Sequence, residues 1–540
     1  MTLPISPENN HFTIGRSVVM ARNGMVATSQ PLACQAGVRI LQEGGNAVDA
    51  AVCAAAVMNV VEPMATGIGG DLFMLIYLSK TKKLLGLNGT GRAPYQAARE
   101  YFIDKGFDKV PSRGMLSVSV PGTVDAWAEA LEQYGTMKLS RVLEPAIEYA
   151  EEGFPVTEII SSEWKENEGL LLKYPDSAGT YLVNGKTPSA GDIFVQKDLA
   201  STFKKIARDG KDAFYKGEIA EAIVRFSKKN GGLLSLKDFA DHTSTWVEPI
   251  RTDYRGFDVY ELPSNSQGQT ALMMLNIIEG FDLKSLGHNS AEFLHILIEA
   301  KKLAFADRDK FIGDPEFADI PESSLLSKEY AEKRRELIDL KKASGGFEPG
   351  APNLSKDTIY MTVADKDGNI VSYINSLFSK FGSGVTVGGT GICLQARASG
   401  FTLEEGHFNC IEPGKRPFHT NIPAMMFRDG KPCVCFGVMG ADMQPQGHVQ
   451  VVSNIVDFDM NAQEAVDAPR FRHVKDKKVC LEKEIPEAVR EGLVAMGHEM
   501  IPESETGLGG FGGAQAIIVD QTGVYLGGSD YRKDGCAAGY

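Results

Sequence analysis

Thr358 carries the residue pattern with the clearest chemical meaning in this chain. The segment before it, residues 341–357, is charged and contains several glycines and prolines, whereas residues 358–364 read as a buried strand. If the bond between Asp357 and Thr358 were cut, Thr358 would carry a free α-amine beside its hydroxyl, the base and nucleophile that a one-residue catalytic centre needs. The pattern therefore predicts autocleavage at this bond and amide-bond chemistry. From strand propensity alone, the alternative is that Thr358 is an ordinary β-branched residue that opens a strand.

The composition favours chemistry on small molecules. The 540 residues are 43% hydrophobic, which is enough for a large core, and a net charge of -14 arises from 56 basic and 70 acidic residues. Because the sequence shows no local basic patch, this charge argues against a nucleic-acid partner or an anionic membrane surface. The longest apolar stretch, residues 50–58, is too short to span a bilayer. We expect a soluble protein with no nucleic-acid or membrane partner.

The eight cysteines and nine histidines form no metal-ligand array by their spacing. Cys433 and Cys435 are two residues apart, which on a strand places both on one face, and no two histidines have the spacing of a helical zinc site. We therefore expect buried, reduced thiols, no metal and no cofactor. The N-terminal residues show no charged segment followed by an apolar one, and together with the sparse cysteines this predicts a reducing, cytoplasmic location.

Strands and helices alternate in the elements that would position Thr358. Hydrophobic periodicity predicts helices over 31–42, 47–61, 291–309, 447–456 and 485–496, and a mostly helical segment over 122–226. The remaining periodic segments read as strands, over 72–78, 84–87, 257–262, 358–364, 370–377, 424–427, 432–438, 515–519 and 524–527. Because both halves of the chain contribute strands, the sequence predicts one interlocked α/β unit.

Eleven short stretches, in order along nearly the whole chain, resemble the γ-glutamyltranspeptidase family, also called glutathione hydrolases. They include Gly67-Ile-Gly-Gly-Asp71 and residues 120–127, 299–315 and 528–540. The resemblance implies the α/β (α+β) fold of the N-terminal nucleophile hydrolases, a four-layer αββα sandwich, and a precursor that cleaves itself before its catalytic threonine.

The resemblance places that threonine at Thr358, counting back from Asp367-Gly-Asn369. It therefore implies a large-subunit segment, residues 1–357, and a small-subunit segment, residues 358–540, which are interlocked and stay associated after cleavage.

The resemblance also assigns groups around the nucleophile. Ser376 stands where the family has a second hydroxyl, usually of threonine, that hydrogen-bonds the nucleophile, and a serine can make the same bond. The alternative is a solvated strand residue. The family's oxyanion turn is Pro-Gly-Gly, and here it reads Met439-Gly440-Ala441. Because backbone N–H donors do not depend on the side chain, we expect Gly440 and Ala441 to form the oxyanion hole. The alternative is a simple glycine turn after a strand.

The positions that bind the γ-glutamyl group in the family carry other residue types here. They are Thr90, Phe378, Arg397, Gly400, His419 and Thr420. Phe378 and Gly400 offer no side-chain acceptor for an ammonium group, and Arg397 adds a cation that would pair with a carboxylate unless it points outward to solvent. Arg92, two residues after Thr90, either supplies a missing cation or is a structural loop arginine.

These observations predict a self-processing N-terminal-threonine amidohydrolase or acyltransferase that acts on an amide of a small acidic acyl compound without a free α-amino group. Within the family, the pattern resembles the cephalosporin-acylase-like or glutathione-hydrolase-like cytoplasmic branch. Two alternatives stay open: a true glutathione hydrolase or γ-glutamyl transferase with a divergent donor pocket, and an uncleaved, non-catalytic member. The expected partners are the small-molecule substrate and the chain's own two segments, and a homodimer is left open.

Overall fold

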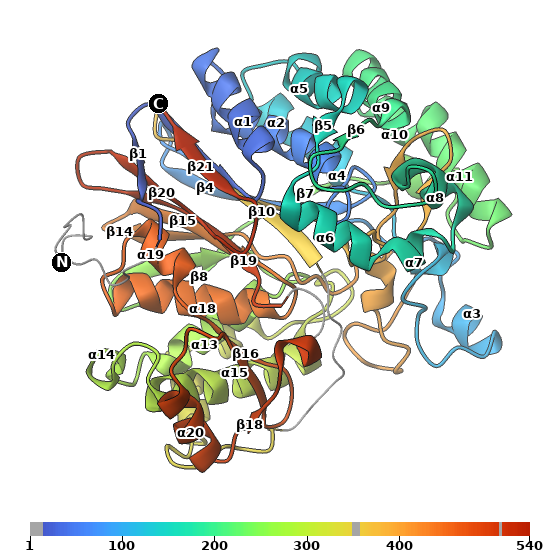
Figure 1. Cartoon of the computed structure of the whole chain (residues 1–540). Helices are drawn as coiled ribbons and strands as arrows, with labels where there is room; N and C mark the ends of the chain where they lie inside the picture. Colours follow the sequence, from blue (N-terminus) through green and yellow to red (C-terminus); the bar gives the residue numbers. More distant parts are fainter. Residues whose placement is uncertain (1–14, 348–356, 507–509) are drawn as a thin grey trace.

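Two stacked antiparallel sheets form the centre of the protein, seen in a computed structural model that describes residues 15–347, 357–506 and 510–540 (Figure 1). The first, which we call the β15 sheet, contains in order β1 (Val19–Ala21), β20 (Tyr525–Ser529), β19 (Gly513–Val519), β15 (Lys431–Met439), β14 (Ala424–Arg428), β9 (Phe257–Glu261) and β8 (Ile250–Tyr254). The second, the β10 sheet, contains β21 (Cys536–Gly539), β2 (Gly24–Thr28), β10 (Asp357–Asp365), β11 (Ile370–Phe378), β3 (Asp71–Leu78), β4 (Lys83–Gly89) and β7 (Thr245–Val247).

A helical layer covers the outer face of each sheet. The β10 sheet packs against α1 (Pro31–Gln42), α2 (Ala47–Val61) and α4 (Thr123–Tyr134), and further out α5 (Leu139–Glu152) packs on α2 and α9 (Lys197–Asp209) packs on α5. The β15 sheet packs against α13 (Gly268–Ile278) and α18 (Met443–Val456), and further out α15 (Ala291–Phe311) packs on α13 and α20 (Glu487–Ala495) packs on α15. Figure 1 shows these two helical groups on opposite sides of the paired sheets. The predicted four-layer αββα class is confirmed.

Successive side chains of a strand point to opposite faces of its sheet, so one strand contributes to two hydrophobic cores. In β3, Leu72 and Met74 pack toward the helices, whereas Phe73 and Leu75 pack toward the β15 sheet. Because both faces of β3 are covered, its sequence is apolar at nearly every position instead of alternating with polar residues. This double burial fixes the strands that carry the candidate site.

Strands from before and after position 357 interleave in both sheets. The β10 sheet places β10 between β2 and β11, and β21 pairs with β2 on the other side. In the β15 sheet, β14 pairs with β9. Each sheet therefore contains strands from both sides of position 357.

Most predicted helix bounds agree closely with the structure. The ranges 31–42 and 47–61 are those of α1 and α2, and α2 begins with a capping box in which the Asn46 side chain accepts from the backbone N–H groups of Val48 and Asp49. Helix α18 begins at Met443, four residues before the predicted start at 447. Pro445 lies in its first turn, where a missing N–H costs no hydrogen bond, so it does not break the helix.

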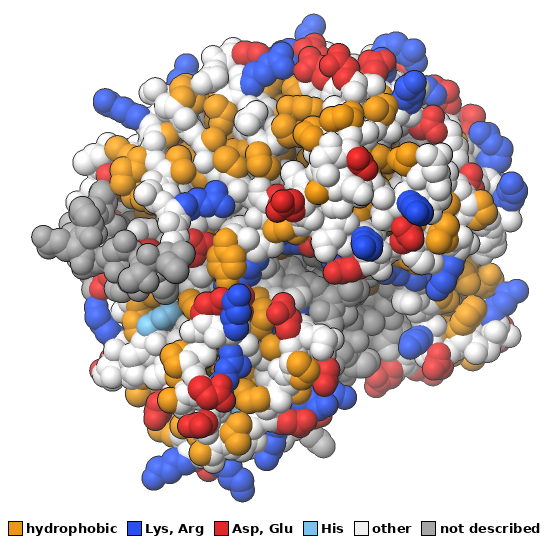
Figure 2. Space-filling model, viewed as in Figure 1, with side chains coloured by type: hydrophobic (Ala, Val, Ile, Leu, Met, Phe, Trp, Pro, Cys, Tyr) orange, Lys and Arg blue, Asp and Glu red, His pale blue; other side chains and the backbone are white. Residues whose placement is uncertain are grey.

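Charged side chains of both signs are interspersed on the face shown in Figure 2. Among the described residues, no helix is both long enough and apolar enough to cross a bilayer.

Candidate active site

Thr358 is the second residue of β10, at one end of a central strand. Asp357 pairs with Phe378 and Ile359 pairs with Asn375, so the register shifts by one residue between them. Ser376 and Leu377 therefore lie opposite Thr358 in a bulge of β11, a feature that often re-aims side chains beside active sites.

Ser376 lies beneath the surface at this bulge. Its side chain is fully buried, and its Oγ accepts a hydrogen bond of 2.7 Å from the backbone N–H of Phe378. The alternative of a solvated strand residue is therefore wrong. Phe378 has a φ of 84°, a left-handed conformation that is uncommon for a bulky residue and that ends the strand.

The Gly67–Asp71 stretch lets the start of β3 approach two other segments closely. A Cβ on Gly69 would lie 2.1 Å from the carbonyl oxygen of Cys393, and a Cβ on Gly70 would lie 2.4 Å from that of Ser376. Only glycine fits at these positions without moving backbone. The stretch thus delivers Asp71 beside Ser376, with which it pairs in the β3–β11 ladder.

Asp71 is a fully buried carboxylate that the sequence analysis did not single out. Its Oδ1 accepts from the backbone N–H groups of Gly91 and Gly122 and from Nε2 of Gln395. Its Oδ2 has no hydrogen-bond partner among the described residues, and lies 3.6 Å from Nε2 of His419. Burial raises the pKa of Asp71 to about 6, although the nearby Arg397 opposes this shift.

Arg397 is also fully buried, so the alternative that it points outward to solvent is wrong. Its guanidinium carbon lies 4.1 Å from the centre of the Phe378 ring, and Nη1 donates to Oγ1 of Thr420 at 3.2 Å. Within the described part of the chain, Nε and Nη2 have no hydrogen-bond partner. Burial lowers the pKa of Arg397 to about 9, opposed by the charge of Asp71. The guanidinium therefore keeps its charge at neutral pH and has two donors to offer.

Gln267 links the segment of Thr420 to the turn that contains Gly440 and Ala441. Its Nε2 donates to the carbonyl oxygens of Thr420 at 2.7 Å and Ala441 at 3.0 Å, and its Oε1 accepts from Nη1 of Arg308. The sequence analysis missed Gln267, although it lies in the Pro263–Gly268 stretch, whose turn residues mark a structured loop.

Asn265, in the same stretch, holds the neighbouring segment. Its carbonyl oxygen accepts from the backbone N–H of His419 at 2.8 Å, and its Nδ2 donates to the carbonyl of Pro417 at 2.7 Å. The His419 ring packs edge-on against Phe73. These contacts fix His419 and Thr420 beside Arg397.

Gly440 and Ala441 both adopt positive φ angles, 112° and 59°. Their carbonyl oxygens accept from the first N–H groups of α18, those of Met443 and Gln444. In the described ranges, the N–H of neither residue donates a hydrogen bond. The turn therefore presents two backbone donors next to the positive end of the α18 dipole, as an oxyanion hole requires.

Thr90 and Arg92 differ in their surroundings. Thr90 is buried, donates through Oγ1 to Oδ1 of Asn88 at 2.6 Å and accepts at its carbonyl from Arg416. Arg92 lies 2.7 Å from a carboxylate oxygen of Glu316 and 3.7 Å from one of Asp314. Two carboxylates thus neutralise Arg92, which favours the structural alternative for this arginine and leaves Arg397 as the cation of the site.

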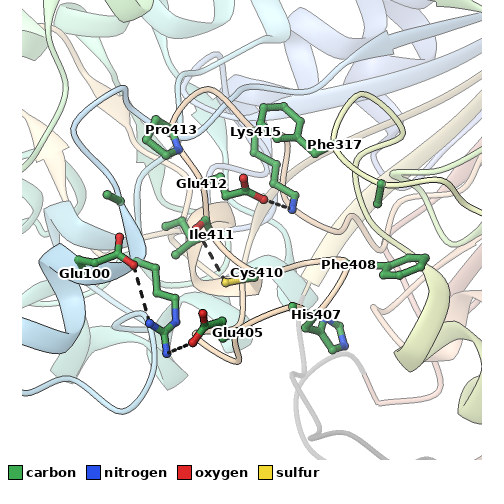
Figure 3. A pocket seen from close by; sticks show the side chains of 14 residues that line it. Glu100, Phe317, Glu405, His407, Phe408, Cys410, Ile411, Glu412, Pro413 and Lys415 are labelled. Carbon is green, nitrogen blue, oxygen red and sulfur yellow. Dashed lines mark hydrogen bonds and ion pairs between the residues drawn. The ribbon is translucent and has the colours of Figure 1, made fainter.

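The segment 401–414 lines a separate pocket. Asn409 Nδ2 donates to the Gly400 carbonyl, which folds this segment back on itself. The pocket has a volume of about 590 Å³ and is walled by Glu100, Phe317, residues 405–408 and Lys415, among others (Figure 3). None of the residues discussed around Thr358 lines this pocket.

One group among the described residues has a composition that could hold a metal ion: His295, Glu299 and His498, all buried. His295 Nδ1 lies 2.8 Å from His498 Nε2, and its Nε2 lies 2.8 Å from the Asp339 carbonyl. Lys302 donates to Glu299 at 2.6 Å. Hydrogen bonds and an ion pair therefore already involve all three side chains, and Nδ1 of His498 is the ring nitrogen left without a hydrogen-bond partner among the described residues.

The four-layer sandwich, with a threonine at the start of a central strand and a donor turn in the facing sheet, defines the class of N-terminal nucleophile hydrolases. A family model described as gamma-glutamyltranspeptidase matches residues 33–540. The chain belongs to this family, and it is an enzyme that acts on amide bonds.

Its relatives include both hydrolases and acylases by name. The glutathione hydrolase-like YwrD proenzyme of Bacillus subtilis is 41% identical over 96% of this chain and 99% of its own. The acylase ACY 1 proenzyme of Pseudomonas sp. strain SE83 is 36% identical over 99% and 97%. The crystal structure of cephalosporin acylase from Bacillus halodurans is 42% identical, covers 99% of each chain and superposes with a TM-score of 0.92.

Proposed function

We propose that the chain is a precursor that cleaves its own Asp357–Thr358 bond, after which Thr358 hydrolyses the amide bond of a small acidic acyl compound. The observation that carries the choice of substrate is the buried Arg397 guanidinium, with two donors unpaired among the described residues. The names of its relatives, which include proenzymes and acylases, support both parts of the proposal.

In this mechanism the new α-amine of Thr358 takes the proton of its own hydroxyl. An α-amine has an unperturbed pKa of about 8, so it is a usable base near neutral pH. The hydroxyl oxygen attacks the amide carbonyl, and the N–H groups of Gly440 and Ala441 hold the oxyanion. The amine returns its proton to the departing nitrogen, and water then hydrolyses the acyl-enzyme.

Arg397 would bind the acyl carboxylate. A carboxylate facing Nε and Nη2 gains a bidentate, charge-assisted pair with a guanidinium that is fully buried. An ammonium at the same place would face a like charge and the Phe378 ring instead of an acceptor. We therefore propose that a glutaryl-type acyl group is preferred over a γ-glutamyl group.

One observation favours a second candidate, a glutathione hydrolase or γ-glutamyl transferase with a different donor pocket. The Oδ2 atom of Asp71 has no hydrogen-bond partner among the described residues and is an acceptor that a γ-glutamyl ammonium would need. Arg397 lies close enough to Asp71 for its charge to influence the pKa of that carboxylate. The two candidates therefore differ in whether Arg397 or Asp71 binds the charged group of the substrate.

Matched glutaryl and γ-glutamyl anilides separate the two candidates. We expect the glutaryl compound to be hydrolysed faster, and Arg397→Gln to lower kcat/KM for it by roughly 10- to 100-fold, the value of a hydrogen bond to a charged group. Arg92→Gln is the matched control, since Arg92 is already paired with Glu316. Equal or better use of the γ-glutamyl compound by the unmutated enzyme would contradict the acidic-acyl proposal.

Intact mass spectrometry tests the cleavage. We expect pieces of 357 and 183 residues, because 540 minus 357 is 183, and a single chain for Thr358→Ala. A small piece that begins at another residue, or cleavage of this bond in Thr358→Ala, would overturn the assignment of Thr358. We also propose a cytoplasmic location, supported by eight cysteines that are all free thiols, and cell fractionation tests it.

A further inference from the structure

Two cysteines meet where the first helix lies on the edge of the β10 sheet. Cys34 is in the first turn of α1, and Cys536 opens β21, the edge strand beside β2. Cys34 belongs to the core between this sheet and the helices, and Cys536 packs against the same core, so both side chains lie on one face of the sheet. Cys34 Sγ lies 3.1 Å from the carbonyl oxygen of Val26 in β2, and Thr28 of β2 pairs with Cys536.

The two thiols have unequal surroundings. Cys34 is fully buried, whereas Cys536 is partly exposed. The neighbouring Cys34 thiol and the charge of Arg16 lower the pKa of Cys536 to about 7, against the opposing effect of burial. Arg16 is held there by hydrogen bonds of 3.3 Å to the Gly535 carbonyl. The same thiol pair and burial raise the pKa of Cys34 well above its usual range.

This asymmetry is typical of a redox-active cysteine pair. An exposed sulfur that is thiolate near neutral pH reacts first with an oxidant, and a protonated thiol beside it can resolve the product. The other six cysteines are all buried, and burial raises the pKa of each: Cys53, Cys393, Cys410, Cys433, Cys435 and Cys480. Selective reaction at Cys536 follows from this difference.

We propose that Cys34 and Cys536 form a reversible disulfide that ties α1 to the C-terminal strand. With glutathione disulfide as the oxidant, the Cys536 thiolate attacks one sulfur and releases one glutathione thiolate. Cys34 then attacks the Cys536 sulfur of the mixed disulfide, its proton passes to the departing sulfur, and a second glutathione leaves. The two protein thiols are oxidised and one glutathione disulfide is reduced to two glutathione molecules.

The position of the two cysteines gives this bond a particular role. Residue 34 precedes the Asp357–Thr358 bond and residue 536 follows it. In a cleaved protein the disulfide would therefore join the large and small pieces covalently. This linking role rests on the proposed cleavage, whereas the formation of the disulfide does not.

Peptide mapping tests the disulfide independently of cleavage. After treatment with glutathione disulfide and alkylation of free thiols, we expect trypsin to release residues 23–39 joined to residues 534–540, each peptide holding one cysteine. The joined species should be lighter than the two peptides by two hydrogen atoms and should disappear on reduction. Cys34→Ala should instead retain glutathione on Cys536, and Cys433→Ala, the matched control, should cross-link like the unmutated protein.

Rates and gels complete the test. Before oxidation, Cys536 should react with a thiol reagent at least tenfold faster than any of the other cysteines. On a denaturing gel without reductant, the oxidised, cleaved protein should run as one species, which reductant separates into two. A mixed disulfide on Cys536 that Cys34 never resolves, or a cross-link to another cysteine, would overturn the proposal. A single band with and without reductant, alongside the joined peptides, would contradict the cleavage and not the disulfide.

Discussion

Replacing Gln267 by alanine should lower kcat more than it changes KM. The side chain is fully buried and donates to the carbonyl oxygens of Thr420 and Ala441, so it holds the proposed oxyanion turn in register with the segment beside Arg397. Deleting one oxyanion donor commonly costs about 100- to 1,000-fold in kcat. Because Gln267→Ala shifts the turn without deleting a donor, we expect a loss of roughly 10- to 100-fold, with KM changed less than about threefold.

The stability cost of this change follows from the same contacts. After the substitution, the Ala441 carbonyl keeps a hydrogen bond from Gln444, and Arg308 keeps its ion pair with Asp442. The Thr420 carbonyl is therefore the partner that loses most of its hydrogen bonding. At about 1 kcal/mol for each of the three lost bonds and 1–3 kcal/mol for a buried unpaired group, Gln267→Ala should lower the free energy of unfolding by roughly 4–6 kcal/mol.

The assay is the initial rate of glutaryl anilide hydrolysis, normalised to the cleaved fraction measured by mass spectrometry, together with a urea unfolding curve. Gln269→Ala is the matched control, because Gln269 is equally buried but its only side-chain hydrogen bond among the described residues is a 3.4 Å contact from Ser264. If Gln267→Ala lost the expected stability but kept kcat within twofold of the unmutated enzyme, Gln267 would be a structural residue only.

Three further predictions concern the groups around Thr358. Ser376→Ala should keep the fold and slow both cleavage and turnover by roughly tenfold, because it removes the hydroxyl that is predicted to hydrogen-bond Thr358; unchanged rates in a mass-spectrometric time course would refute its role. Burial raises the pKa of Asp71 from 3.8 to about 6, so the fold favours the protonated form, and stability should fall by about 3 kcal/mol as the pH rises from about 4 to above 6. Asp71→Asn should remove this slope in urea titrations, and an unchanged slope would contradict the assignment. Gly70→Ala should prevent accumulation of folded protein, since its Cβ would lie 2.4 Å from the Ser376 carbonyl, whereas Gly67→Ala, with its nearest contact at 3.5 Å, should fold; equal yields would contradict the close approach.

Local pattern was sufficient for the helices and most strands, because hydrophobic periodicity and capping residues act over a few positions. It predicted α1 and α2 at their observed bounds, and it placed the start of α18 too late because Pro445 reads as a break outside a first turn. Strand order could not be read in the same way. The pairing of β2 with β21 joins residues at opposite ends of the chain, and no local signal encodes that contact.

The residues of the candidate site also differ in whether the local sequence could predict them. The loop-to-strand transition selects Thr358, and a turn after a strand selects Gly440 and Ala441. The hydrogen bond from Gln267 to Ala441 spans 174 positions and that from Gln395 to Asp71 spans 324, so their contributions appear only once the fold brings these residues together. The burial of Arg397, which decides between a solvated cation and a binding group, also depends on residues far from it in sequence.

The interleaving of the sheets has a consequence for how the protein is made. The neighbours of β2 in its sheet, β10 and β21, begin 329 and 508 residues after β2 ends (357 minus 28 and 536 minus 28). At typical translation rates, the second interval lasts roughly 25 to 100 s. During synthesis the sheet that covers α1 and α2 is therefore incomplete: α2 lacks β10 and β11 for the first interval, and α1 lacks β21 for the second. Productive folding therefore begins late in synthesis, and the nascent chain should depend on chaperones that shield apolar surface until its last strands emerge.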